Sequence, residues 1–312
     1  MPRWPLLMAL LALTAALAGC GDDGQPLTPK SSPTRIVFVS ARNVNTEIWV
    51  MNGDGSEQRQ LTFTSNNSGS PSWSSDGTRI LFTRWWMVGP ALKSGLFRMK
   101  SDGSEVACLD SIPDGYYGSP HYSPDGTKIV CERNANSARQ VWLLNADGSG
   151  PINLTPGGEQ GASPEWSPDG TRIVYSRATA IGWRIYTMKP DGSDTLKVLE
   201  TNVANSNQYQ PSWSPDGASI AYVDDHGVHG ATEFTWIDIV NANGTNVRPV
   251  TPLTNGIRSE PCWSRDGLRI AYRDDIYPAD IFSVNPDGTN VINVSRYPAA
   301  HDISPDWGPA VR

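Results

Sequence analysis

The sequence predicts an all-β fold, a six-bladed β-propeller in which each blade is a four-stranded antiparallel sheet. Two observations support this. A motif close to Pro-x-Trp-Ser-Pro-Asp-Gly recurs six times, and its aromatic residues lie 44 to 50 residues apart. Short apolar segments follow each copy, and a repeat of roughly 40–50 residues made of strands is typical of propellers. The aromatic positions are Trp73, Tyr122, Trp166, Trp213, Trp263 and Trp307.

The third copy shows how one repeat divides into strands. Its apolar segments are rich in β-branched and aromatic residues, and Asp169-Gly170 and Asp191-Gly192 interrupt them. Asp-Gly between two such segments is a strong hairpin signal, because Gly supplies the positive φ that the turn needs. We name the strands A to D in chain order and expect them at 163–167, 172–176, 184–188 and 196–199.

The two ends of the chain complement each other. Residues 34–38, 47–51 and 58–62 match strands B, C and D, and no strand A precedes them. The sixth copy ends just after its strand A, at Trp307. We therefore expect this C-terminal strand to pair with the N-terminal strands and close the ring, which leaves no open blade edge at the seam. The propeller is predicted to occupy residues 34–312.

The N-terminal residues indicate export. Residues 1–19 contain one charge, Arg3, and an apolar run that is too short to span a membrane, as in a signal peptide. The sequence Leu17-Ala18-Gly19-Cys20 resembles a bacterial lipobox, which implies cleavage before Cys20 and acylation of its thiol. An ordinary cleavage site beside a chance cysteine is the alternative. We expect a tether over residues 20–33 and a lipoprotein on the periplasmic or outer-membrane side of the envelope.

Charge and cysteine content narrow the possible partners. The chain has 25 basic and 32 acidic residues, a net charge of −7, so a nucleic-acid partner and a polybasic membrane surface are not expected. Membrane contact should come from lipid alone. Cys108, Cys131 and Cys262 show neither metal-site nor disulfide spacing, and the last two are expected to be small buried residues. The Asx-x-Asp-Gly segments faintly resemble calcium loops but are interpreted as C–D turns. We predict no cofactor.

Two strings place the repeat in a known group. Pro-x-Trp-Ser-Pro-Asp-Gly-x-x-Ile-x-Tyr and Ile-Tyr-x-Met-x-x-Asp-Gly resemble the TolB-type propeller repeat, and the resemblance covers residues 34–312. It implies a cell-envelope propeller that binds other proteins, although one fold can serve many functions. In TolB itself an α/β domain precedes the propeller. We expect this chain to lack that domain, so roles that rest on it are not carried over.

Propeller geometry separates the loops into two sets. The A–B and C–D turns lie on one face and repeat closely, whereas the B–C and D–A loops lie on the other face and vary. Variable loops on a rigid frame commonly bind partners. A long B–C loop is expected at residues 85–90, although its adjacent Trp residues could instead cover the blade's outer edge. The candidate binding residues on this loop face are Trp85, Trp86, Tyr116, Tyr117, Tyr209, His226, His229, Tyr277, Tyr297 and His301.

Two functions fit these observations. The first is a monomeric, non-catalytic envelope lipoprotein that serves as a scaffold for a protein or peptide partner. The alternative is a metal-dependent lyase or hydrolase acting on envelope polysaccharide, because His226-x-x-His229 with nearby Asp residues could hold a metal or supply a base. The chain contains no Gly-x-Ser-x-Gly motif, and we assign no catalytic residue. His121, which follows the motif's first proline, is expected to pack between blades.

Overall fold

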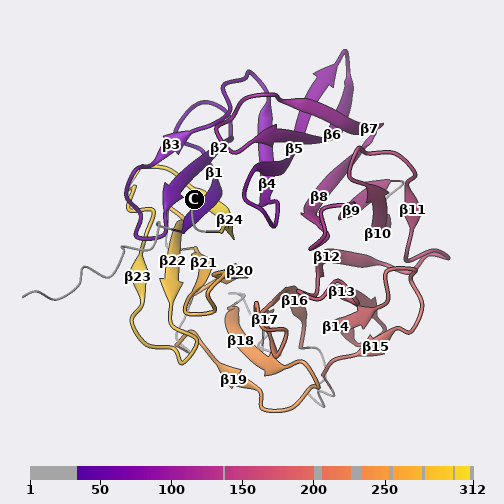
Figure 1. The fold of residues 1–312 in the computed structure, drawn as a ribbon, viewed down its shortest axis with the longest axis vertical. Coiled ribbons are helices and arrows are strands. Elements are labelled where there is room, and N and C mark those ends of the chain that lie inside the picture. The colour runs from indigo at the N-terminus through magenta and orange to yellow at the C-terminus, as the bar shows by residue number, and fades with distance from the viewer. Residues whose placement is uncertain are drawn as a thin grey trace, which may run out of the picture. The chain divides into compact units, whose positions relative to one another are not determined.

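The computed structural model describes residues 34–135, 138–199, 206–225, 234–252, 256–275, 278–297 and 299–309. These ranges belong to one compact unit. Every regular element in them is a β-strand, and the 24 strands form six four-stranded antiparallel sheets. Figure 1 shows the six sheets arranged in a ring. The described part contains no helix that could span a membrane, and the predicted signal peptide, Cys20 and tether lie outside it.

The first blade closes the ring as predicted. Its order is β24-β1-β2-β3, and the innermost strand β24 pairs antiparallel with β1 through Ile36 opposite Trp307 and Val37 opposite Asp306. The N-terminal and C-terminal strands of the described chain therefore meet inside one sheet. The four strands are β1 (Arg35–Ser40), β2 (Glu47–Asn52), β3 (Arg59–Gln60) and β24 (Asp302–Trp307).

The other five blades each run outward in chain order. The second contains β4 (Asn67–Trp73), β5 (Arg79–Val88), β6 (Ala91–Lys100) and β7 (Ala107–Pro113). The third contains β8 (Gly115–Tyr122), β9 (Lys128–Ala135), β10 (Ala138–Asn145) and β11 (Ile152–Asn153). The fourth contains β12 (Gly161–Trp166), β13 (Ile173–Thr179), β14 (Gly182–Met188) and β15 (Leu196–Lys197). The fifth contains β16 (Gln208–Trp213), β17 (Ser219–Asp224), β18 (Trp236–Asn241) and β19 (Arg248–Pro249). The sixth contains β20 (Arg258–Trp263), β21 (Ile270–Asp274), β22 (Asp280–Val284) and β23 (Ile292–Asn293).

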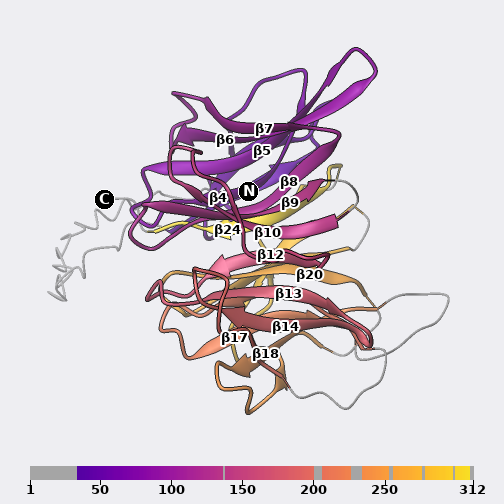
Figure 2. The same ribbon diagram turned by 90° about the vertical axis from the view of Figure 1, so that its right-hand side faces the viewer.

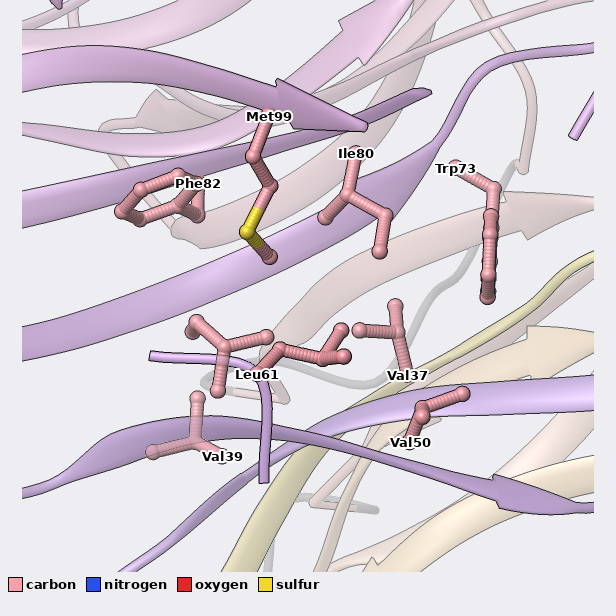
Figure 3. Close-up of a cluster of buried hydrophobic side chains, with 9 residues drawn as sticks. Val37, Val39, Val50, Leu61, Trp73, Ile80, Phe82 and Met99 are labelled. Atoms are coloured by element: carbon pink, nitrogen blue, oxygen red, sulfur yellow. The ribbon is translucent and has the colours of Figure 1, made fainter. Parts of the chain in front are cut away.

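The hydrophobic core is divided among the interfaces between neighbouring blades. Because alternate residues of a strand face opposite sides of its sheet, each blade presents apolar side chains to both neighbours. In Figure 3, Val37 and Val50 of the first blade face Ile80 and Met99 of the second. Trp73 is 4% exposed and belongs to the same cluster. The repeated aromatic residue thus helps to hold adjacent blades together.

Each innermost strand carries a β-bulge at the residue before the motif's proline. Proline cannot donate a hydrogen bond to the ladder, so the pairing is interrupted there. In the fourth blade, for example, the register shifts between Ala162 and Glu165. The residues before the proline all have positive φ, between 42° and 56°: Ser70, Ser119, Ser163, Gln210, Glu260 and Ser304. The bulge places side chains on both sides of the proline along the ring's centre.

The Asp residues of the turns serve the backbone, which confirms the turn interpretation. Asp54 Oδ1 accepts hydrogen bonds from the Ser56 backbone N at 2.9 Å and from Ser56 Oγ at 2.6 Å. These bonds, led by the Ser56 hydroxyl, lower the pKa of Asp54. In the A–B turn, Asp76 Oδ1 accepts from Ser74 Oγ at 2.6 Å. One carboxylate oxygen of each of these Asp residues is therefore engaged within its own turn.

The expectation that the candidate residues of the loop face lie in loops was wrong for residues 85–88 and for three tyrosines. Residues 85–88 continue β5 and pair with β6, with Trp85 opposite Ser94 and Trp86 opposite Lys93. Only Gly89 and Pro90 connect the two strands, and the hairpin end extends beyond its neighbours in Figures 1 and 2. Likewise Tyr116 and Tyr117 lie in β8, and Tyr209 lies in β16. Backbone pairing continues past the apolar run because it satisfies the N–H and C=O groups that a loop would leave open.

Candidate binding site in the central channel

The innermost strands of the six blades surround a central channel. Two adjoining cavities occupy it, of about 110 Å³ and about 220 Å³. His121, Glu165, Cys262 and Asp306 line both of them. All four occupy the position between the motif's proline and its aromatic residue. The expectation that His121 packs between blades was therefore wrong, because the bulge turns this position toward the channel.

The larger cavity opens on the face that carries the A–B turns, which we call the turn face. Arg265 and the turn prolines Pro124, Pro168 and Pro215 also line it. Arg265 stands where four other copies of the motif have proline, and its Nε donates to the Trp307 carbonyl oxygen at 3.2 Å. The cavity walls include every repeated aromatic residue, namely Trp73, Tyr122, Trp166, Trp213, Trp263 and Trp307.

The channel carboxylates also connect neighbouring blades. Asp306 Oδ2 accepts a hydrogen bond of 2.7 Å from the Trp73 backbone N. Glu165 Oε1 accepts one of 3.2 Å from the Trp213 backbone N. In each case an acid of one innermost strand binds the backbone of the next. One oxygen of each carboxylate is thereby fixed, while both side chains remain partly open to the channel.

Burial shifts the ionisation of the channel groups. It raises the pKa of Glu165 to about 8, and the carboxylate of Asp306 adds to this effect. It also raises the pKa of Asp306 to about 6, although the Arg265 guanidinium opposes the rise. The pKa of His121 is lowered to about 4 by burial and by Arg265. The channel therefore offers a neutral imidazole, acids that titrate near neutral pH, and the fixed cation of Arg265.

The structure places the predicted loop-face aromatics mainly against their own blades. A Cβ added at Gly69 would lie 2.6 Å from the Trp85 ring, so this indole covers the glycine. Trp86 packs edge-on against Phe97 with ring centroids 6.0 Å apart. Both Trp residues are half-buried. A part of each indole thus covers the blade, as the alternative interpretation expected, and the rest of its surface stays accessible to solvent.

The tyrosine candidates differ in accessibility. Tyr116 donates its hydroxyl to Glu132 Oε1 at 2.9 Å. Tyr117 is 3% exposed and donates to Asp110, so its side chain does not reach the surface. Tyr297 is 41% exposed. Tyr209 packs beside Trp183 in a separate cavity on the loop face.

The histidine candidates give no metal site in the described part of the chain. His301 is exposed, and its Nδ1 accepts a hydrogen bond from the Ala279 backbone N at 3.2 Å. His226, His229 and Tyr277 lie outside the described residues. Within the described ranges, no group of three or more His, Cys, Asp or Glu side chains could hold a metal ion.

Sequence reasoning missed the channel, although the sequence contained a clue to it. The residue between proline and the aromatic position changes from copy to copy, while its neighbours repeat. A position whose residue type changes while its neighbours repeat does not need one fixed side chain for the packing between blades. In chain order the six residues are Ser72, His121, Glu165, Ser212, Cys262 and Asp306.

Comparison with known proteins agrees with this architecture. The TolB homolog of Chlorobaculum tepidum is 33% identical over 141 residues, which cover 45% of this chain and 31% of that protein. The Tol-Pal system protein TolB of Anaeromyxobacter dehalogenans is 29% identical over 122 residues, 39% of this chain and 27% of that protein. The matched segments thus span about a third of these relatives or less.

Solved structures show the same fold at low identity. TolB from Acinetobacter baumannii superposes with a TM-score of 0.71 at 16% identity, over 88% of this chain and 67% of that chain. The hydrazine synthase of Kuenenia stuttgartiensis gives 0.73 at 14% identity, over 89% of this chain and 47% of that chain. At such identities the likeness concerns the fold alone. The TolB beta propeller domain family matches residues 21–207, and this chain belongs to that family.

Proposed function

We propose that the protein is a non-catalytic scaffold of the cell envelope that binds a segment of a protein partner in its central channel. One observation carries the proposal. The repeat keeps its frame constant but changes the side chain that lines the channel, as with His121, Glu165 and Asp306. Six copies of one frame, with five residue types at this position, thus give one asymmetric site, which is what recognition of a specific partner needs.

The chemistry of the turn-face opening supports a peptide occupant. Its walls are aromatic, and aromatic surfaces contribute most of the energy at many protein interfaces. Its floor combines the carboxyl groups of Glu165 and Asp306 with the guanidinium of Arg265. Such a mixture can pair with backbone amides and with side chains of either charge. The loop-face residues Trp85 and Trp86 remain a second region where contact with a partner is predicted.

The relatives suggest the kind of partner. Several are named as TolB proteins of Tol-Pal systems. By that analogy the partner is a component of such a system, and the protein acts on the periplasmic side of the envelope. The lipobox-like sequence before Cys20 supports an acylated anchor. Glycoside or peptide cleavage is not part of the proposal.

A binding assay with a defined partner tests the channel. The probe is the purified Pal protein of Anaeromyxobacter dehalogenans, measured against the immobilised chain by surface plasmon resonance. Arg265→Pro introduces the residue that four other copies carry, and Asp306→Asn keeps the shape of the side chain but removes its charge. Each is expected to weaken binding at least tenfold, which corresponds to about 1.4 kcal/mol.

Matched variants distinguish the two faces. Ser193→Ala changes only a turn hydroxyl that is bound to Asp191 at 2.6 Å and should leave affinity unchanged. If Trp85→Ala/Trp86→Ala abolishes binding while Arg265→Pro does not, the partner uses the loop face and the channel assignment is wrong. If wild type does not bind Pal at all, the Tol-Pal partner is excluded.

A further inference from the structure

A separate cavity of about 430 Å³ opens on the loop face over the fourth and fifth blades. Cavities of this size are typical of small-ligand sites. Its lining comes from the loop-face ends of strands in four blades, including Trp183 of β14, Tyr209 of β16 and Ser259 of β20. We call it the Trp183 cavity. It shares Ser163 and Gln210 with the channel but none of the aromatic ring at the turn face.

One wall of the Trp183 cavity is aromatic and apolar. The rings of Trp183 and Tyr209 lie 6.3 Å apart between centroids with planes inclined at 45°. Strand pairing holds both in place, with Trp183 opposite Ala178 and Tyr209 opposite Val223. Ile257 extends the wall and is 40% exposed. The wall is therefore a preformed surface made of half-buried aromatic side chains.

The other wall offers neutral hydrogen-bonding groups. Gln210 Oε1 accepts from the Glu260 backbone N at 3.0 Å, which orients the side-chain amide and leaves its NH₂ group as a donor. The hydroxyls of Ser163 and Ser259 also line the cavity and make no hydrogen bond within the described part of the chain. Ser163 is a bulge residue with φ of 50°, so backbone geometry rather than packing sets its position.

The charge of the cavity limits the ligand. Among the described residues that line it, Arg139 is the charged side chain and none is a carboxylate. The Arg139 side chain is 49% exposed, and its Nε forms an ion pair with Glu132 Oε1 at 3.7 Å. A guanidinium has five N–H donors, so the nitrogens that do not face Glu132 can still pair with a ligand carboxylate.

We propose that the Trp183 cavity binds a sugar ring that carries a carboxylate. The C–H face of a pyranose fits against an aromatic face, because the ring quadrupole presents negative charge there. Sugar hydroxyls pair with Ser163, Ser259 and the Gln210 amide, and the carboxylate pairs with Arg139. The inference is independent of the channel proposal, because it concerns a different ligand class and a different face.

The test compares two sugars that differ only in the carboxylate. Glucuronic acid and glucose are titrated into the full-length protein, and binding is followed by saturation-transfer NMR. Glucuronic acid is expected to bind more tightly. Trp183→Ala should weaken it at least tenfold, Trp183→Phe should restore a part of the affinity, and Arg139→Gln should remove the preference over glucose.

Controls make each outcome decisive. Phe63 is a 76%-exposed aromatic residue that follows a strand D in the first blade, so Phe63→Ala should bind both sugars like wild type. The proposal is overturned if wild type binds neither sugar, or if Trp183→Ala melts like wild type and binds as tightly. Equal affinity for the two sugars in wild type would also overturn it, because the carboxylate would then not be recognised. Arg265→Pro should leave sugar binding unchanged.

Discussion

At the scale of single residues, one side-chain type serves two opposite purposes. Asp76 in an A–B turn receives hydrogen bonds from Ser74 and Thr78, and these lower its pKa. Asp306 in the channel is surrounded by protein, and burial raises its pKa. The turn role was predictable, because Asp-Gly between two strands is typical of a tight turn. The channel role was not, because it depends on six strands from distant parts of the sequence meeting at one axis.

The ionisation of Glu165 gives a prediction about pH. Its pKa is about 8 in the folded protein against about 4.3 in an unfolded chain. Between these values the folded state binds more protons, so the contribution of Glu165 to stability falls as pH rises. Glu165→Gln should therefore raise the melting temperature at pH 8 relative to wild type. At pH 4 the two proteins should melt alike, and an equal shift at both values would contradict the raised pKa.

At the scale of elements, the strands that follow the repeat were predictable from the sequence, and the strands that deviate from it were not. The fourth blade follows the expected strands closely, because its Asp-Gly turns mark where pairing must reverse. The β5–β6 hairpin departs from the pattern, since Trp85 and Trp86 look like loop contacts in sequence but continue the ladder. The cover that Trp85 provides over Gly69 depends on the lack of a side chain there. Sequence alone does not show which glycine faces which ring.

The pairing of β24 with β1 gives a prediction about closure. Deleting residues 301–312 removes β24, leaves β1 as an open edge, and takes Trp307 out of the cluster that contains Ile36 and Phe38. Loss of one large buried aromatic side chain alone costs about 3–5 kcal/mol. The truncated chain should aggregate or lose cooperative thermal unfolding. Deleting only residues 310–312 keeps β24 and should melt like wild type; a soluble, cooperatively melting 301–312 deletion would refute the closure.

At the scale of the whole molecule, the two proposed binding surfaces lie on opposite faces of one ring. The turn face repeats and surrounds the aromatic opening of the channel, whereas the loop face varies and carries the Trp183 cavity. The turn-face cavity and the Trp183 cavity have no lining residue in common. Variants on one face should therefore leave binding on the other unchanged.

The position of this ring in the cell depends on one residue in our proposal, Cys20. The net charge of −7 gives no electrostatic attraction to anionic lipid, so acyl chains must supply the membrane contact, at about 0.8 kcal/mol for each buried CH₂ group. Cys20→Ala should move the protein from the membrane fraction to the soluble fraction after cell fractionation. Because Cys20 precedes the predicted propeller of residues 34–312, the variant should keep the wild-type melting temperature. Retention in the membrane fraction at high salt would show a second anchor and contradict the proposal.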